Sequence, residues 1–81
     1  MKLTITSLKK IEYEGEAVSV NLKTTSGEIT VLDGHRPLVT ALASGPAVIT
    51  KKDGDKFNFG ISSGFMEVNS NSEVTILADG K

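Results

Sequence analysis

The sequence contains no cysteine and no tryptophan, and aromatic residues make up only 5% of its 81 residues. Without cysteine, a disulfide-stabilised secreted fold and a thiolate metal site are both excluded, and a reducing compartment is favoured. No stretch approaches the roughly 20 apolar residues of a transmembrane helix. The first residues, Met1 to Thr6, alternate polar and apolar side chains, unlike a signal peptide. We therefore expect no direct insertion into a membrane.

The chain also lacks an excess of charge of one sign, because its nine lysine and arginine residues nearly balance its ten acidic residues. No basic stripe is present, and the few aromatic residues are not interleaved with lysine or arginine. Nucleic-acid binding is therefore not expected. A phosphate-binding loop of the Gly-x-x-x-x-Gly-Lys type is absent, and we expect no cofactor. The length allows one domain, residues 1–81.

Apolar and polar residues alternate along most of the chain, which predicts half-buried antiparallel strands. Turn-forming pairs with glycine, such as those at residues 14–15, 53–54 and 63–64, separate the alternating segments. No segment keeps the spacing of an amphipathic helix. The pattern predicts an all-β sandwich or barrel of about nine strands. Its inward-facing residues are expected to be Leu3, Ile5, Val18, Val20, Leu22, Ile29, Val31, Phe57, Phe59, Ile61, Val74 and Ile76.

The segment after Pro37 is apolar at Leu38, Val39, Ala41 and Leu42, which lie on both faces of an extended strand. Proline cannot donate to a β-ladder, so this strand should begin at Pro37 or lie at a sheet edge. Two interpretations stay open. The strand is buried between two sheets, or its outer face is covered by a partner protein.

Two short motifs suggest chemistry that their surroundings do not support. Residues 60–64 match the Gly-x-Ser-x-Gly pattern of serine hydrolases, but an apolar strand follows instead of the helix that this motif needs. We expect Ser62, Ser63 and Gly64 to form a bend between two strands. The sequence Asp53-Gly54-Asp55 lacks the further ligands of a calcium loop and predicts a hairpin turn.

The only histidine, His35, follows a glycine in a loop, with Glu28 and Asp33 as the nearest acids. A hydrogen-bonding or interface role is expected for it, rather than catalysis or metal binding. Glu28 follows a turn, where it is either a solvated acid or a partner contact. A free-standing sandwich that binds a small molecule or glycan is the alternative function, but its usual exposed tryptophan or tyrosine is scarce here. An enzyme ranks last.

Five segments, in the same order and at similar spacing, resemble the epsilon subunit of F-type ATP synthases. The resemblance covers nearly the whole chain and corresponds to the N-terminal domain of that subunit. The segment Gly34-His35-Arg36-Pro37-Leu38-Val39-Thr40-Ala41-Leu42 is close to the family's Gly-His-x-Pro-Leu-x-Thr-x-Leu. The other four segments are residues 14–20, 25–29, 63–68 and 74–79.

The resemblance implies a flattened antiparallel β-sandwich of about ten short strands. It also implies a non-catalytic subunit that docks gamma onto the c ring of the F1Fo complex and couples proton-driven rotation to ATP synthesis. This complex would lie on the cytoplasmic face of the bacterial inner membrane. By the same resemblance, Gly27, Glu28 and Ile29 would contact the c ring. The gamma subunit would be contacted by His35, Pro37, Leu38, Thr40, Ala41 and Leu42.

The chain departs from the family pattern at four positions. Asp33 stands where the family usually has proline, and Arg36 replaces a common alanine. Thr30 and Ser63 replace frequent glycines, so the backbone there is expected to avoid positive φ. In most relatives a helical hairpin that restrains ATP hydrolysis follows the sandwich and in some members binds ATP. The sequence reaches Lys81 before such a hairpin, and neither property is assigned to it.

Overall fold

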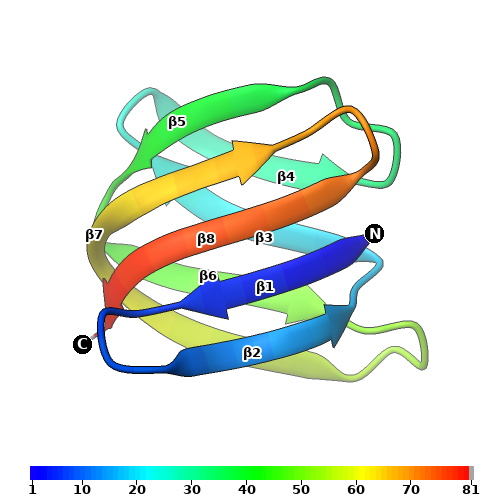
Figure 1. Cartoon of the computed structure of the whole chain (residues 1–81), viewed down its shortest axis with the longest axis horizontal. Coiled ribbons are helices and arrows are strands. Elements are labelled where there is room, and N and C mark those ends of the chain that lie inside the picture. Colours follow the sequence, from blue (N-terminus) through cyan, green and yellow to red (C-terminus); the bar gives the residue numbers. More distant parts are fainter. Residues whose placement is uncertain (81) are drawn as a thin grey trace.

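The computed structural model describes residues 1–80, and every regular element in that range is a β-strand (Figure 1). The predicted all-β fold class is confirmed. Eight strands are present, close to the nine or ten expected. They are β1 (Lys2–Thr6), β2 (Ile11–Glu16), β3 (Ser19–Thr24), β4 (Gly27–Leu32), β5 (Leu38–Leu42), β6 (Gly45–Thr50), β7 (Lys56–Val68) and β8 (Glu73–Gly80).

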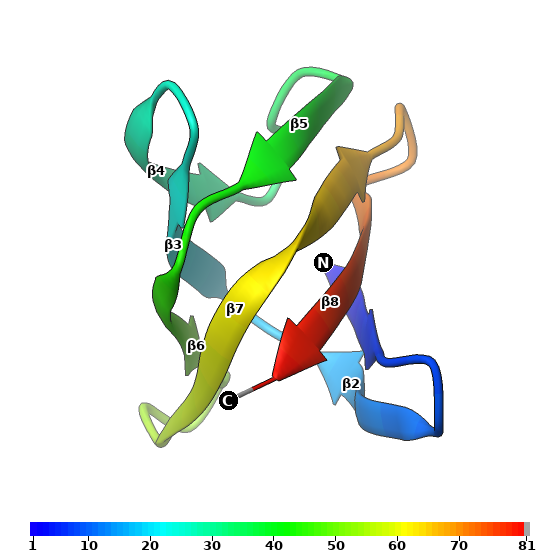
Figure 2. The ribbon, with the colours of Figure 1, turned by 90° about the vertical axis from the view of Figure 1, so that its left-hand side faces the viewer.

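The strands form two layers that share the long strand β7 (Figure 2). One layer runs β2-β1-β8-β7-β5, and the other contains β4, β3, β6 and the first half of β7. Strand β7 pairs with β6 from Lys56 to Ile61 and with β5 from Gly64 to Val68. The layers also meet where Thr24 of β3 pairs with Leu42 of β5. The result is a sandwich that is closed along one side.

Strand β7 explains why there are fewer strands than expected. The bend predicted between two strands at Ser62–Gly64 was wrong in one respect, because these residues belong to a single strand of 13 residues. The ladder between β7 and β8 shifts register between Ile61 and Ser63, which is a β-bulge. A bulge increases the local twist. It therefore redirects β7 from one layer to the other without ending the strand.

The sheet is antiparallel except for one pair, β1 and β8, which run parallel. Leu3 lies beside Val74 and Ile5 beside Ile76 in this pair. β1 and β8 lie at opposite ends of the chain, so no hairpin turn in the sequence indicates that they pair. The expectation of a fully antiparallel sandwich is corrected at this position.

The core lies between the layers, and most of the predicted inward-facing residues are buried there. The prediction that Val18 faces inward was wrong, because its side chain is 48% exposed and it precedes β3, which begins at Ser19. Ile29, Phe57 and Phe59 are half-buried and pack against the core. The residues that were predicted and are buried are Leu3, Ile5, Val20, Leu22, Val31, Ile61, Val74 and Ile76.

The predicted turn at residues 53–54 is confirmed, whereas the turn predicted at residues 14–15 was wrong, because Glu14 and Gly15 lie inside β2 and pair with β1. At Asp53–Asp55 the Asp55 amide donates to the Asp53 side chain at 3.0 Å, and the Gly54 amide donates to the Lys51 carbonyl at 2.9 Å. The turn after β7 contains no glycine, and Ser72 takes a positive φ of 58°. Within residues 1–80 no other residue except glycine does so, as expected for Thr30 and Ser63.

Candidate functional site

Strand β5 has one face toward the core and one toward solvent. Leu42 is 4% exposed and belongs to the core, and Leu38 is half-buried against it. Val39 points the other way and is 70% exposed. Pro37 lies immediately before the strand, as its missing N–H predicts. Of the two interpretations of this strand, the structure therefore favours an exposed outer face.

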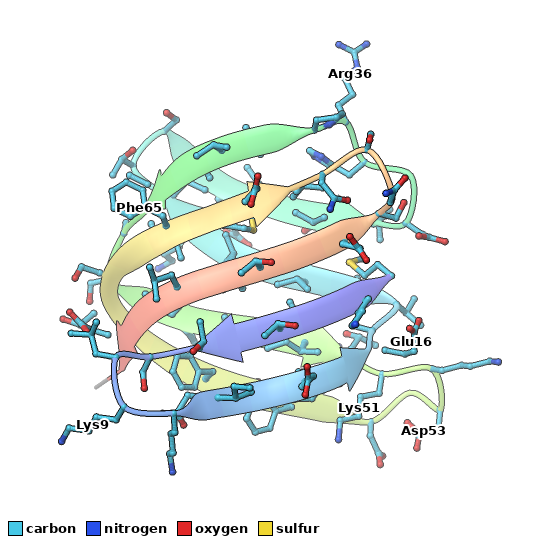
Figure 3. All side chains as sticks on the ribbon, viewed as in Figure 1. Lys9, Glu16, Arg36, Lys51, Asp53 and Phe65 are labelled. Atoms are coloured by element: carbon cyan, nitrogen blue, oxygen red, sulfur yellow. The ribbon has the colours of Figure 1, made fainter. Side chains whose placement is uncertain are left out.

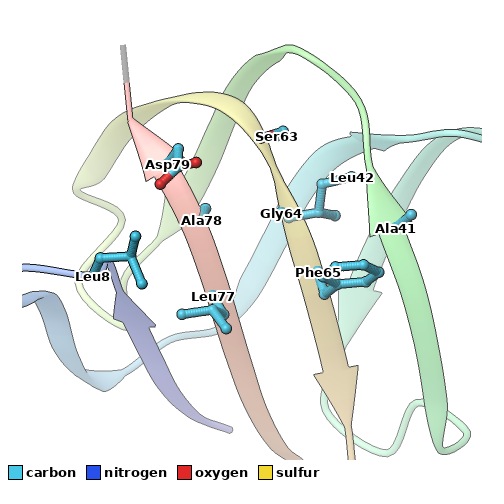
Figure 4. A pocket seen from close by; sticks show the side chains of 9 residues that line it. All are labelled: Leu8, Ala41, Leu42, Ser63, Gly64, Phe65, Leu77, Ala78 and Asp79. Atoms are coloured by element: carbon cyan, nitrogen blue, oxygen red, sulfur yellow. The ribbon is translucent and has the colours of Figure 1, made fainter.

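The outer face of β5 continues across two further strands. Ala41 is paired with Phe65 of β7, and Phe65 is paired with Leu77 of β8, so these three side chains form a row across the sheet. Phe65 is 59% exposed and Leu77 is 48% exposed. Leu8, from the loop between β1 and β2, is 89% exposed beside them (Figure 4). We name Leu8, Val39, Ala41, Phe65 and Leu77 the outer apolar face.

Sequence reasoning placed Val39 and Ala41 on a strand whose outer face a partner would cover, but it missed Leu8, Phe65 and Leu77 as candidate contacts. A signal was present for the two residues of β7 and β8. Residues 65–66 and 76–78 are apolar without a break, so each strand must place apolar side chains on both faces. The pairing of these outward-facing residues into one row depends on strand order, which the sequence does not display.

A pocket of about 420 Å³ lies within this face (Figure 4). Gly64, Ala41 and Ala78 are among its lining residues, and their small or absent side chains leave this space open. Phe65, Leu77 and Leu8 rise around it, and its polar side chains are Ser63 and Asp79. Such a lining can receive an apolar side chain of a partner but brings together no pair of groups for acid–base chemistry.

The hairpin of β3 and β4 holds the residues assigned to the c ring. Its two-residue turn is Thr25–Ser26, so Gly27 and Glu28 begin β4 beside the tip. The buried Thr24 hydroxyl donates to the Gly27 carbonyl at 2.8 Å and accepts from the Ser26 amide at 3.0 Å. Glu28 is exposed, whereas Ile29 is half-buried against the core. Gly27 and Glu28 therefore project from a braced tip.

His35 closes the turn between β4 and β5. Its amide donates to the Leu32 carbonyl at 3.1 Å, and its ring Nδ1–H donates to the Arg36 carbonyl at 2.8 Å. The expected hydrogen-bonding role is thus seen within the loop. Asp33, at the position where the resembled family usually has proline, places its Oδ1 3.7 Å from the α-amino group of Met1. Arg36 extends away from the molecule (Figure 3).

The predicted contact residues fall into two groups along β5. Gly27 and Leu42 both pair with Thr24, so the c-ring group begins close to the end of β5. His35 and Pro37 precede the opposite end of that strand. Leu42 contributes its side chain to the core, and in a complex only its backbone would be available.

The remaining motifs show no arrangement for catalysis or metal binding. Residues 60–64 lie inside β7, where no helix follows the serines. Across residues 1–80 no group of three histidine or acidic side chains could hold a metal ion. Tyr13, the only tyrosine in the sequence, is half-buried and stacks on Phe57 with ring centroids 5.3 Å apart. In the same range, no helix is long and apolar enough to cross a membrane.

A small all-β sandwich with an apolar outer face and an exposed carboxylate beside a hairpin tip is typical of the class of protein-binding modules. Comparison with known proteins specifies the class. The family described as ATP synthase, Delta/Epsilon chain, beta-sandwich domain matches residues 1–80. The chain belongs to this family.

Curated relatives agree with this assignment. The chain is 38% identical over 79 residues to the ATP synthase epsilon chain of Clostridium kluyveri, covering 98% of this chain and 59% of the relative. It is 42% identical over 76 residues to the epsilon chain of Corynebacterium glutamicum, covering 93% of this chain and 60% of the relative. The chain thus spans about three-fifths of the length of these relatives.

Two solved structures are also similar. A chain in the Euglena gracilis mitochondrial ATP synthase, described as OSCP/F1/c-ring, superposes with a TM-score of 0.89 at 31% identity, covering 94% of this chain and 48% of that one. A chain in the central stalk and c ring of the Tetrahymena thermophila mitochondrial ATP synthase superposes with a TM-score of 0.81, covering 96% and 62%. At 16% identity, the second likeness supports the fold alone.

Proposed function

We propose that this chain is a non-catalytic central-stalk component of an F-type ATP synthase, which docks the gamma subunit onto the c ring. The match of residues 1–80 to the epsilon sandwich carries this proposal. A similar chain occurs in an assembly that includes F1 and the c ring. The complex would lie on the cytoplasmic face of a bacterial inner membrane, where the chain would couple proton-driven rotation to ATP synthesis.

The gamma contact is assigned to β5 and to the outer apolar face. Apolar side chains in one row, around a pocket of about 420 Å³, would lose much of their exposed area against a partner. Burial of apolar area contributes about 25 cal/mol per Å². Phe65 is the natural centre of this contact, because buried aromatic side chains often dominate binding energy. His35 and Pro37 would extend the contact beyond the start of β5.

The c-ring contact is assigned to Gly27, Glu28 and Ile29. The tip of the β3–β4 hairpin is fixed by the Thr24 hydroxyl, so little ordering is needed on binding. Glu28 offers a carboxylate that basic or amide groups of the ring's polar loops would pair with. The two contacts therefore differ in chemistry, with one mainly apolar and the other charged.

The test is co-elution of the chain with purified α3β3γ in size-exclusion chromatography. Leu77→Asp places a charge in the outer apolar face. It should lower the affinity for α3β3γ at least tenfold, and with it the fraction of chain that co-elutes, because an unpaired charge is costly to bury. Leu32→Asp is the matched control, since Leu32 is 55% exposed on the other layer against 48% for Leu77. Equal binding by both folded variants would contradict the assigned surface. Failure of the wild-type chain to bind would overturn the proposed function.

A further inference from the structure

Glu28 is held in place by a neighbouring side chain that sequence reasoning did not single out. The Asn21 amide Nδ2 donates to Glu28 Oε2 at 3.0 Å and to Thr30 Oγ1 at 2.8 Å. Asn21 is paired directly with Thr30 across the β3–β4 ladder, so all three side chains lie on the outer face of the hairpin. Thr30 thus orients the amide, and the amide in turn orients the carboxylate.

The cross-strand partner of Glu28 does not neutralise it. Lys23 is paired with Glu28 in the ladder, and opposite charges at such positions normally attract. The Lys23 side chain instead leans over Gly45, where its Cδ would lie 3.1 Å from an added Cβ. No ion pair or hydrogen bond within residues 1–80 occupies Glu28 Oε1. The carboxylate is therefore fixed by a neutral group while its charge stays available.

We infer that Asn21 is a positioning residue, which presents the free oxygen of Glu28 to a cationic or amide donor on the c ring. This inference rests on the proposed function, in which Glu28 contacts the ring. A carboxylate held by a neutral amide loses little side-chain entropy on binding and keeps its full charge. Thr30 contributes as the second acceptor, in a position where a glycine would leave one amide hydrogen of Asn21 unpaired.

The test is a double-mutant cycle on binding of the folded chain to detergent-solubilised c ring. Asn21→Ala should weaken binding roughly two- to fivefold, the range for exposed charged pairs. In the Glu28→Ala background the same change should have no effect, because the group that Asn21 positions is gone. Asn58→Ala is the matched control, since Asn58 is an exposed asparagine in a strand of the same layer.

The outcomes separate the inference from the function beneath it. Equal effects of Asn21→Ala with and without Glu28, or no effect at all, would overturn the positioning role while leaving the c-ring contact intact. Equal binding by wild type and Glu28→Ala would overturn the c-ring contact at Glu28 itself. A second readout needs no partner. In the isolated chain, the side-chain amide resonances of Asn21 should shift in Glu28→Ala, and unshifted resonances would contradict the hydrogen bond.

Discussion

Gly64 is the residue on which the shared strand β7 depends most directly. It has a φ of +150°, which side chains rarely adopt, and an added Cβ would lie 2.7 Å from Ala78 Cα and closer still to the Leu77 carbonyl oxygen. Neither backbone atom can move without breaking the β7–β8 ladder. Gly64→Ala should lower the free energy of unfolding by about 3 kcal/mol or more, measured by urea denaturation.

Gly54→Ala is the control for this prediction. Gly54 also has a positive φ, +92°, but an added Cβ there meets nothing within 4 Å. Only backbone strain of about 1 kcal/mol is expected. If the two variants lose the same stability, close packing against β8 is not what requires glycine at position 64.

Thr24 is a buried polar residue that braces the proposed c-ring contact. Its hydroxyl both donates to Gly27 and accepts from Ser26. Thr24→Val keeps the shape but leaves these two backbone groups without their partner, and it should cost about 1–2 kcal/mol of stability. Thr25→Val, at an exposed turn position, should cost much less. Thermal unfolding of both variants compares them directly, and equal losses would argue against the brace.

At the scale of elements, the turn between β7 and β8 is built around one side chain. Asn69 Oδ1 accepts from the amides of Asn71 and Glu73 at 2.9 and 3.0 Å, and its Nδ2 donates to the Glu73 carboxylate at 2.7 Å. Asn69→Ala should lower the free energy of unfolding by about 1–2 kcal/mol. Asn71→Ala, in the same turn and exposed, should change it by less than about 0.5 kcal/mol. A comparable loss in both would contradict this account of the turn.

Elements with local signals were predictable from the sequence, and elements that depend on distant pairing were not. Alternation identified β1 and β3, and the turn at Asp53–Asp55 was identified by Asp-Gly. The parallel pairing of β1 with β8 joins residues about 70 positions apart, so no local pattern encodes it. In the sequence, the bulge near Ser63 resembles a strand end, because a glycine often marks either feature.

The candidate site divides in the same way. The exposed apolar face of β5 was predictable, because four of the five residues in this strand are apolar, which is too many for one buried face. The contribution of Phe65 and Leu77 to that face was not predictable, because their place beside β5 follows from strand order. Asn21 was missed for a different reason. A single asparagine in a strand carries no signal until the register sets it opposite Thr30.

At the scale of the whole molecule, the two proposed contacts should respond differently to salt. Raising NaCl from about 0.1 M to about 1 M shortens the Debye length from about 10 Å to about 3 Å. Binding to the c ring through Glu28 should weaken roughly two- to fivefold over this range, as expected for an exposed ion pair. Binding to α3β3γ through the outer apolar face should hold or tighten, because apolar burial carries no charge to screen.

The variant Glu28→Gln isolates the charge that this prediction depends on. It keeps an oxygen that can accept from Asn21, so the hairpin geometry should persist while the ion pair with the ring is lost. Its affinity for immobilised c ring, measured by surface plasmon resonance at both salt concentrations, should be lower than that of the wild type and nearly independent of salt. If added salt lowers the wild-type affinities for the c ring and for α3β3γ to the same extent, charge dominates both contacts. That result would contradict the assignment of the gamma contact to the outer apolar face.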